Sequence, residues 1–330
     1  MDLSTPYLGF KLVSPLIVGA SPLADDIHTA RLIQDAGAGA IVMRSLFEEQ
    51  IYLDEVSRAP QPHLVATDGF HERAMFPGLA DYQLSPDQYL RQIEQLKAAL
   101  AVPLIASLNG CRPGGWIDYA SRFEAAGADA IELNLYHLST EPESSALDVE
   151  AEMLETVRLV KSSVHIPVAV KLQPFYTSLA HFAQKLGRAG ADGIVLFNRF
   201  YQADIDITEQ EPETRLRLSD PAELLLRLRW LAILSPRLRC SLALTGGIHD
   251  GVDVIKGILA GAHVVQLVSV VLRHGPRFLA TLTESLRKWM VERGYETIAD
   301  FRGAMNLDRC TDMAAFERGS YQRILQNWRV

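Results

Sequence analysis

Cysteines are scarce in this chain, and long apolar runs are absent. Its three cysteines, Cys111, Cys240 and Cys310, are too scattered for a disulfide framework or a metal site, so a reducing compartment is expected. The longest apolar stretch, around residues 264–272, is interrupted by polar residues and is too short to span a membrane. The first ten residues lack the basic and apolar regions of a signal peptide. We therefore expect a soluble, cytoplasmic protein.

Positive charge is also in short supply. The chain has 32 lysines and arginines against 40 aspartates and glutamates, which gives a formal net charge of -8. Proteins that bind nucleic acid usually present a basic face to the phosphates, so nucleic acid is not an expected partner. With 48% hydrophobic and 22% charged residues, the composition is that of an ordinary globular protein. A small-molecule ligand is the expected partner.

A repeated pattern predicts the fold. Four segments, AGAGAIVM (36–43), AGADAIEL (126–133), AGADGIVL (189–196) and AGAHVVQL (260–267), each read as a helix end, a left-handed glycine and a buried strand. They begin 90, 63 and 71 residues apart. A βα unit takes about 30 residues or a little more, so each interval holds two units. The repeats therefore mark the even strands of an eight-stranded fold.

The odd strands are predicted between the repeats, at LIVGA (16–20), PLIASL (103–108), PVAVKL (167–172) and LALT (242–245). Eight alternating strands and helices predict a single (β/α)8 TIM barrel, and a doubly wound open sheet is the alternative. We expect one domain over residues 1–330, with a C-terminal extension from about residue 295 that becomes helical near residue 312. Long loops are expected after the second, fourth and sixth strands, the first at about residues 46–85 and the third with room for a small hairpin.

Polar residues at the carboxyl ends of the strands are the candidate site, because TIM barrels place function there. Lys171 lies in an apolar strand, where lysine is seldom buried unpaired. It could bind an anionic ligand, form a Schiff base or pair with Glu132. Arg44 also needs an anionic partner, either a ligand or a carboxylate. His137 could act as an acid or base, or be an ordinary loop histidine.

A glycine pair marks a second candidate site. Gly246 and Gly247 directly follow the seventh strand, where their backbone could surround a phosphate or simply form a turn. Ser269, after the eighth strand, could donate to the same phosphate. The arginines of the preceding helix and its end are expected on a solvated face: Arg227, Arg229, Arg237 and Arg239.

These features together resemble the FMN-dependent dihydroorotate dehydrogenase family, in particular its soluble class 1 branch. The runs LGFKL (8–12) and VKLQP (170–174) carry the resemblance, with the carboxyl-end residues, and it covers nearly the whole chain. It implies that FMN is the cofactor and that nine residues bind it: Ala20, Ser21, Asn109, Asn134, Lys171, Asn198, Gly246, Gly247 and Ser269. It also implies that Arg44, where the family usually has lysine, and Asn198 bind the substrate.

The sequence departs from the family at the loop after the fourth strand. The family reads Asn-Leu-Ser-Cys-Pro-Asn there, with cysteine as the base, and this chain has Asn134-Leu135-Tyr136-His137. The resemblance thus implies His137 or Tyr136 as the acid/base group and Lys171 as the third catalytic residue.

The implied activity is an FMN-dependent dehydrogenation of a CH–CH group in a small substrate. In the family this is dihydroorotate to orotate in pyrimidine biosynthesis, and class 1 relatives are often homodimers. Three alternatives remain open. They are a flavin-free lyase that uses Lys171 as a Schiff base, a flavin-binding subunit of a larger redox complex, and a tRNA-dihydrouridine synthase, which the acidic composition disfavours.

Overall fold

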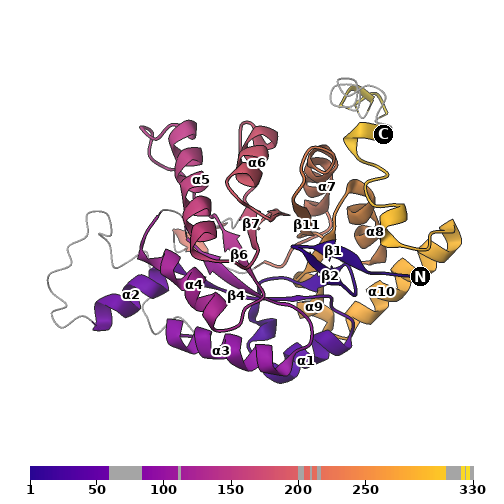
Figure 1. Ribbon diagram of the computed structural model, residues 1–330. Coiled ribbons are helices and arrows are strands. Elements are labelled where there is room, and N and C mark those ends of the chain that lie inside the picture. The colour runs from indigo at the N-terminus through magenta and orange to yellow at the C-terminus, as the bar shows by residue number, and fades with distance from the viewer. Residues whose placement is uncertain are drawn as a thin grey trace.

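The computed structural model describes residues 1–58, 84–110, 113–199, 204–208, 210–213, 217–309, 321–323 and 325–327. Eight parallel strands close into a barrel, which confirms the predicted (β/α)8 architecture (Figure 1). In barrel order they are β3 (Leu16–Val18), β4 (Ile41–Phe47), β5 (Leu104–Asn109), β6 (Ala130–Asn134), β7 (Val168–Leu172), β8 (Gly193–Leu196), β11 (Ser241–Thr245) and β12 (Val264–Leu267). All eight coincide with the predicted segments.

Helices surround the barrel, and their apolar faces pack against the strands (Figure 1). They are α1 (Ile27–Asp35), α2 (Glu48–Arg58), α3 (Pro86–Ala99), α4 (Asp118–Ala125), α5 (Ala146–Ser163), α6 (Leu179–Arg188), α7 (Glu223–Leu234), α8 (Gly251–Ala260), α9 (Ser269–His274) and α10 (Phe278–Arg293).

Helix α3 shows how the sequence determines where a helix begins. Ser85 and Gln88 form a reciprocal capping box, and Pro86 occupies the first turn.

The four repeats adopt the predicted backbone. Their glycines have φ values of 96°, 99°, 106° and 121°, in the order Gly37, Gly127, Gly190 and Gly261. These angles favour glycine because a side chain would clash with the backbone there. Each glycine ends a helix and turns the chain into the next even strand, which explains why the pattern recurs.

A further part of the repeat joins neighbouring strands at the amino end of the barrel. In three repeats, the side chain just before the even strand accepts a hydrogen bond from a backbone N–H in the first two residues of the preceding odd strand. The pairs are Asp129 with Leu104 at 2.8 Å, Asp192 with Val168 at 2.8 Å, and His263 with Leu242 at 3.0 Å. The first repeat has Gly39 instead, because a Cβ there would lie 2.2 Å from the carbonyl oxygen of Ser14.

An N-terminal hairpin that the sequence analysis did not predict covers the amino end of the barrel. Strands β1 (Thr5–Tyr7) and β2 (Phe10–Leu12) form it. Thr5 Oγ1 donates to the carbonyl oxygen of His263 at 2.9 Å, and the backbone N–H of Leu8 donates to Ser241 Oγ at 3.0 Å. The side chains of Tyr7, Leu8 and Leu12 pack against inward-facing residues of the barrel strands.

Three predictions about connecting segments have mixed outcomes. The loop predicted at residues 46–85 is wrong at its start, because β4 continues to Phe47 and α2 follows at once; residues 59–83 lie outside the described residues. The hairpin after the sixth barrel strand is confirmed as β9 (Asp204–Asp206) and β10 (Glu211–Glu213). Of the predicted C-terminal helix, residues 321–323 and 325–326 are described and helical. No helix in the described part of the chain is both long enough and apolar enough to cross a membrane.

Candidate functional site

A cavity of about 290 Å³ lies at the carboxyl ends of the barrel strands. Its volume is close to the lower end of small-molecule sites, roughly 300–1,000 Å³. Seven of the nine predicted cofactor-binding residues line it: Ala20, Ser21, Lys171, Asn198, Gly246, Gly247 and Ser269. Strand ends far apart in the sequence thus meet around one space, as they do at TIM-barrel active sites.

Lys171 brings a buried positive charge to the cavity wall. Its Nζ donates to Glu132 Oε1 at 3.0 Å, and Glu132 Oε2 accepts from Gln266 Nε2 at 2.6 Å. The side chains of Lys171 and Glu132 are 8% and 1% exposed. The structural pairing with Glu132 is therefore present, and the same lysine faces the cavity. Of the three roles considered for Lys171, pairing with Glu132 is therefore compatible with binding an anionic ligand.

The glycine pair forms a turn that only glycine can make without strain. Gly246 and Gly247 have φ values of 89° and 78°. A Cβ on Gly247 would lie 2.5 Å from the backbone N of Leu224, and a Cβ on Gly246 would lie 2.7 Å from Nε of Arg227. Successive backbone N–H groups in such a turn can surround an anion without a side chain in the way.

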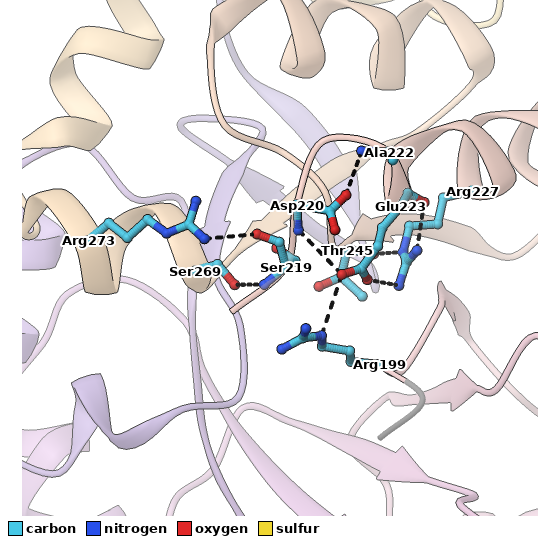
Figure 2. A network of polar contacts seen from close by, with 9 residues as sticks. All are labelled: Arg199, Ser219, Asp220, Ala222, Glu223, Arg227, Thr245, Ser269 and Arg273. Atoms are coloured by element: carbon cyan, nitrogen blue, oxygen red, sulfur yellow. Dashed lines mark hydrogen bonds and ion pairs between the residues drawn. The ribbon is translucent and has the colours of Figure 1, made fainter. Parts of the chain in front are cut away.

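Polar groups from two other segments flank this turn (Figure 2). The backbone N–H of Ser219 donates to Ser269 Oγ at 3.0 Å, and Arg273 Nη2 donates to the carbonyl oxygen of Ser219 at 3.3 Å. Because Ser269 Oγ is an acceptor in this contact, its hydroxyl hydrogen is left to donate to a ligand. The Ser269 hydroxyl is therefore a donor available at the end of the cavity near the turn.

Arg227 is the residue of this region that the sequence analysis misplaced. Expected on a solvated face, it is 5% exposed, and its guanidinium lies against the glycine turn. Figure 2 shows it beside Thr245, the residue before the turn. The helical spacing contained a signal for this burial. Arg227 follows Leu224 by three residues and precedes Leu231 by four, so it lies on the buried stripe of α7. The exposed Leu225 and Leu226 obscure that stripe in the sequence.

Asn109 and Asn134 are the two predicted cofactor-binding residues outside the cavity lining. They are neighbours in the β5–β6 register. Asn134 Nδ2 donates to Ser45 Oγ at 3.0 Å and Ser107 Oγ at 3.2 Å, and its Oδ1 accepts from Asn198 Nδ2 at 3.5 Å. The Asn134 amide thus joins the barrel wall to Asn198, which lines the cavity.

Arg44 has a carboxylate partner within the chain. Its Nε donates to Asp25 Oδ1 at 2.8 Å, and its Nη2 also contacts the Asp25 carboxylate. The hydroxyl of Tyr89 donates to the Arg44 carbonyl oxygen at 2.7 Å and fixes the backbone. Of the two partners expected for Arg44, a ligand or an acidic residue, the structure shows the acidic residue.

His137 lies beside a different cavity from Lys171. This second cavity, of about 340 Å³, is also lined by Glu141, Gln173 and Tyr176. Gln173 Nε2 donates to the backbone carbonyl oxygen of His137 and fixes that segment of the loop. Tyr136, the other predicted acid/base residue, is in the lining of neither cavity. The structure therefore groups seven of the predicted cofactor residues, Lys171 among them, around one cavity, and neither acid/base candidate lines that cavity.

The Lys171 cavity fits a phosphorylated flavin in its donor chemistry. Ser21 is 5% exposed, lines the cavity, and its Oγ has no hydrogen-bond partner in the part of the chain that the structure describes. A buried hydroxyl without a partner is costly unless a ligand or water completes it. Gly246 and Gly247 provide the close backbone approach that a phosphate needs, and Lys171 provides a cation at a separate point of the wall.

Comparison with known proteins places the chain in a family. The family model for dihydroorotate dehydrogenase matches residues 80–290. A protein of Aeropyrum pernix, provisionally named dihydroorotate dehydrogenase A (fumarate), is 28% identical over 92% of this chain and 97% of its own length. The catalytic subunit of dihydroorotate dehydrogenase B (NAD(+)) from Thermoplasma volcanium is 27% identical over 92% and 98%. Subunit PreA of the NAD-dependent dihydropyrimidine dehydrogenase of Escherichia coli is 25% identical over 92% and 77%.

The family match spans more than half of the chain, and it agrees with the barrel and with the position of the cavity. The chain belongs to the dihydroorotate dehydrogenase family.

Proposed function

We propose that this oxidoreductase depends on FMN and acts on a CH–CH group of a small substrate in the cytoplasm. The observation that supports it best is the pairing of a buried lysine with a glycine turn along one cavity. When bound, FMN would supply the electron-accepting chemistry of the reaction. Ser269 and the backbone of Gly246 and Gly247 would hold its phosphate.

Lys171 would favour negative charge on the group bound in the cavity. It is well positioned for this because Glu132 fixes its ammonium and the surroundings exclude water, which strengthens electrostatic interactions. The same ion pair argues against the lyase alternative. A Schiff-base lysine must present its amine to a carbonyl group, and the Nζ of Lys171 is instead directed to Glu132 Oε1 at 3.0 Å.

For the substrate, we propose dihydroorotate or a related dihydropyrimidine, which would connect the protein to pyrimidine biosynthesis. The names of the relatives support this class of substrate. We keep Asn198 as a substrate-binding residue, because it lines the cavity. We also keep Arg44, although a substrate would have to compete with Asp25 or bind beside it. His137, assisted by Tyr136, stays the proposed acid/base group and would need its loop to move toward the Lys171 cavity.

The remaining proposals concern organisation. We propose a single domain over residues 1–330 and a homodimer in solution. We assign no electron acceptor. A separate protein subunit is one candidate for this role, because several relatives are named as subunits of larger enzymes.

An anaerobic absorption spectrum of the purified protein, taken before and after addition of dihydroorotate, tests the proposal. Bound FMN should give the absorption bands of an oxidised flavin, and dihydroorotate should bleach them. Bound flavin that dihydroorotate leaves oxidised, but that dihydrouracil or dihydrothymine bleaches, would assign a different dihydropyrimidine. Absence of flavin even after reconstitution with FMN would refute the cofactor assignment.

A further inference from the structure

Arg227 forms a buried polar network directly behind the glycine turn (Figure 2). Its Nε donates to the carbonyl oxygen of Thr245 at 2.5 Å, and its Nη1 donates to the carbonyl oxygen of Glu223 at 2.6 Å. Nη2 contacts Glu223 Oε2 at 3.3 Å. The guanidinium therefore ties the end of β11, directly before the turn, to the start of α7 and fixes the position of both.

The guanidinium also touches the turn itself. A Cβ built on Gly246 would lie 2.7 Å from Nε and 2.8 Å from Nη2 of Arg227. The cation thus occupies the space that a side chain on Gly246 would need, on the side of the turn where α7 packs. A charge buried this close to backbone amides acts through protein and little solvent, so it reaches a ligand on the turn with weak screening.

The carboxylate that neutralises Arg227 is shared. Glu223 Oε1 lies 3.5 Å from Nε of Arg199, and Glu223 Oε2 lies 3.3 Å from Nη2 of Arg227 (Figure 2). The other nearby carboxylate, Asp220, accepts from the backbone N–H of Ala222 at 2.8 Å. An amide N–H does not neutralise that carboxylate, so the network holds three guanidiniums, those of Arg199, Arg227 and Arg273, against two carboxylates, and its formal charge is positive (Figure 2). An anion on the turn would balance it.

We propose that Arg227 makes this turn selective for a phosphorylated flavin over an unphosphorylated one. It does so in two ways: it fixes the turn through Thr245, and it supplies positive charge from behind the turn. This inference rests on the proposed flavin function and adds a positioning residue for its phosphate. Arg199 belongs to the same network through Glu223 and itself lines the cavity.

Binding of two flavins to the apoprotein separates a charge effect from a general loss of structure. FMN carries the phosphate and riboflavin lacks it, so the ratio of their Kd values reports the phosphate contribution. Quenching of flavin fluorescence on binding measures both Kd values. In Arg227→Met, FMN binding should weaken about tenfold or more, while the Kd for riboflavin should change less than about twofold. Arg229→Met is the matched control, because Arg229 is exposed on the same helix, and it should change neither Kd.

A second variant tests the charge without removing Arg227. Glu223→Gln removes the shared carboxylate, so it should strengthen FMN binding several-fold, again with riboflavin unchanged. It keeps the test decisive if Arg227→Met does not fold. Equal weakening of both flavins in Arg227→Met, or weaker FMN binding in Glu223→Gln, would overturn the charge role. A wild-type protein that binds neither flavin would instead refute the proposed cofactor, which is a distinguishable failure.

Discussion

The buried pair of Lys171 and Glu132 is the residue-level feature on which the proposed chemistry depends. Lysine and glutamate are almost never fully buried unless paired, and each of these side chains is at least nine-tenths covered. The sequence could indicate that Lys171 needs an anionic partner, because its strand neighbours are apolar. It could not decide between a ligand and Glu132, since both satisfy the same electrostatic requirement. Only the register of β6 against β7 brings the two side chains together.

Removing one partner of this pair should destabilise the protein more than removing both. Lys171→Met leaves Glu132 buried without its cation, which should lower the free energy of unfolding by about 3 kcal/mol or more. Lys171→Met combined with Glu132→Gln should recover about 1 kcal/mol or more of that loss. Urea denaturation measures both. Lys97→Met is the control, because its pair with Asp129 is more exposed, and it should cost about 1 kcal/mol or less. Additive losses in the double variant would contradict the coupling.

The glycine turn leads to a second prediction at the same scale. Gly247→Ala places a Cβ 2.5 Å from the backbone N of Leu224 at a φ of 78°, so we expect a loss of about 2 kcal/mol in unfolding free energy and weaker FMN binding. Gly187→Ala in α6 is the control. A Cβ there meets no atom within 4 Å in the described structure, so helix propensity should raise stability slightly. Thermal melts and flavin titrations compare the two, and normal FMN binding by Gly247→Ala would count against the turn as a phosphate site.

The four repeated helix–strand junctions show what can be predicted at the scale of elements. Their glycines were predictable because a helix end that turns at once into a strand needs the left-handed backbone, and glycine adopts it without strain. The side-chain link to the neighbouring strand was not predictable. It requires knowledge of which strand starts beside each junction, and the sequence does not state that register. The N-terminal hairpin was missed for a similar reason, since three-residue strands give too short a pattern to detect.

His263 is the exception among these links, and it should make the protein sensitive to acid. Its Nδ1 accepts from the backbone N–H of Leu242, and burial, helped by the nearby Arg302, lowers the pKa of His263 to about 4. In the unfolded chain, His263 becomes protonated near pH 6.5, whereas in the folded protein it stays neutral down to about pH 4. The contribution of neutral His263 to the free energy of unfolding is therefore complete above pH 6.5. It is lost as the pH falls from 6.5 toward 4, by about 2 kcal/mol at pH 5.

Replacing His263 by the residue of the other repeats should remove this sensitivity. An aspartate stands at the same place in two of them, and there it accepts the equivalent N–H. His263→Asp can accept from Leu242 and can face Arg302, so we expect stability near that of the wild type at pH 7. Its decline between pH 7 and pH 5 should be smaller by about 2 kcal/mol. Urea denaturation at both values of pH measures the difference. An equal acid-induced loss in both proteins would show that His263 is not the cause.

At the scale of the whole molecule, the barrel has a closed end and an open end. The N-terminal hairpin and inward-facing strand residues fill the amino end with apolar side chains, and the cavity lies at the carboxyl end. Lys171, whose charge Glu132 balances, lies on the cavity side of this division. The packed end is apolar, and the polar groups gather at the other end, along the cavity. The eight-stranded order was predictable from the spacing of the repeats. The division of the predicted site between two cavities was not, because it depends on how the loop after β6 leaves the barrel.

The hairpin gives a test of whether the molecule unfolds as one domain. Leu12 is 2% exposed against the barrel interior, so Leu12→Ala should lower the free energy of unfolding by about 2–5 kcal/mol. Lys11→Ala is the neighbouring control, and it should change the value by about 0.5 kcal/mol or less because Lys11 is exposed. If hairpin and barrel form one cooperative unit, tryptophan fluorescence and far-UV circular dichroism will give the same urea midpoint, and both will shift together in Leu12→Ala. Midpoints that stay unchanged in both probes in Leu12→Ala would mean that the hairpin unfolds separately, because the tryptophans and the helices lie outside it.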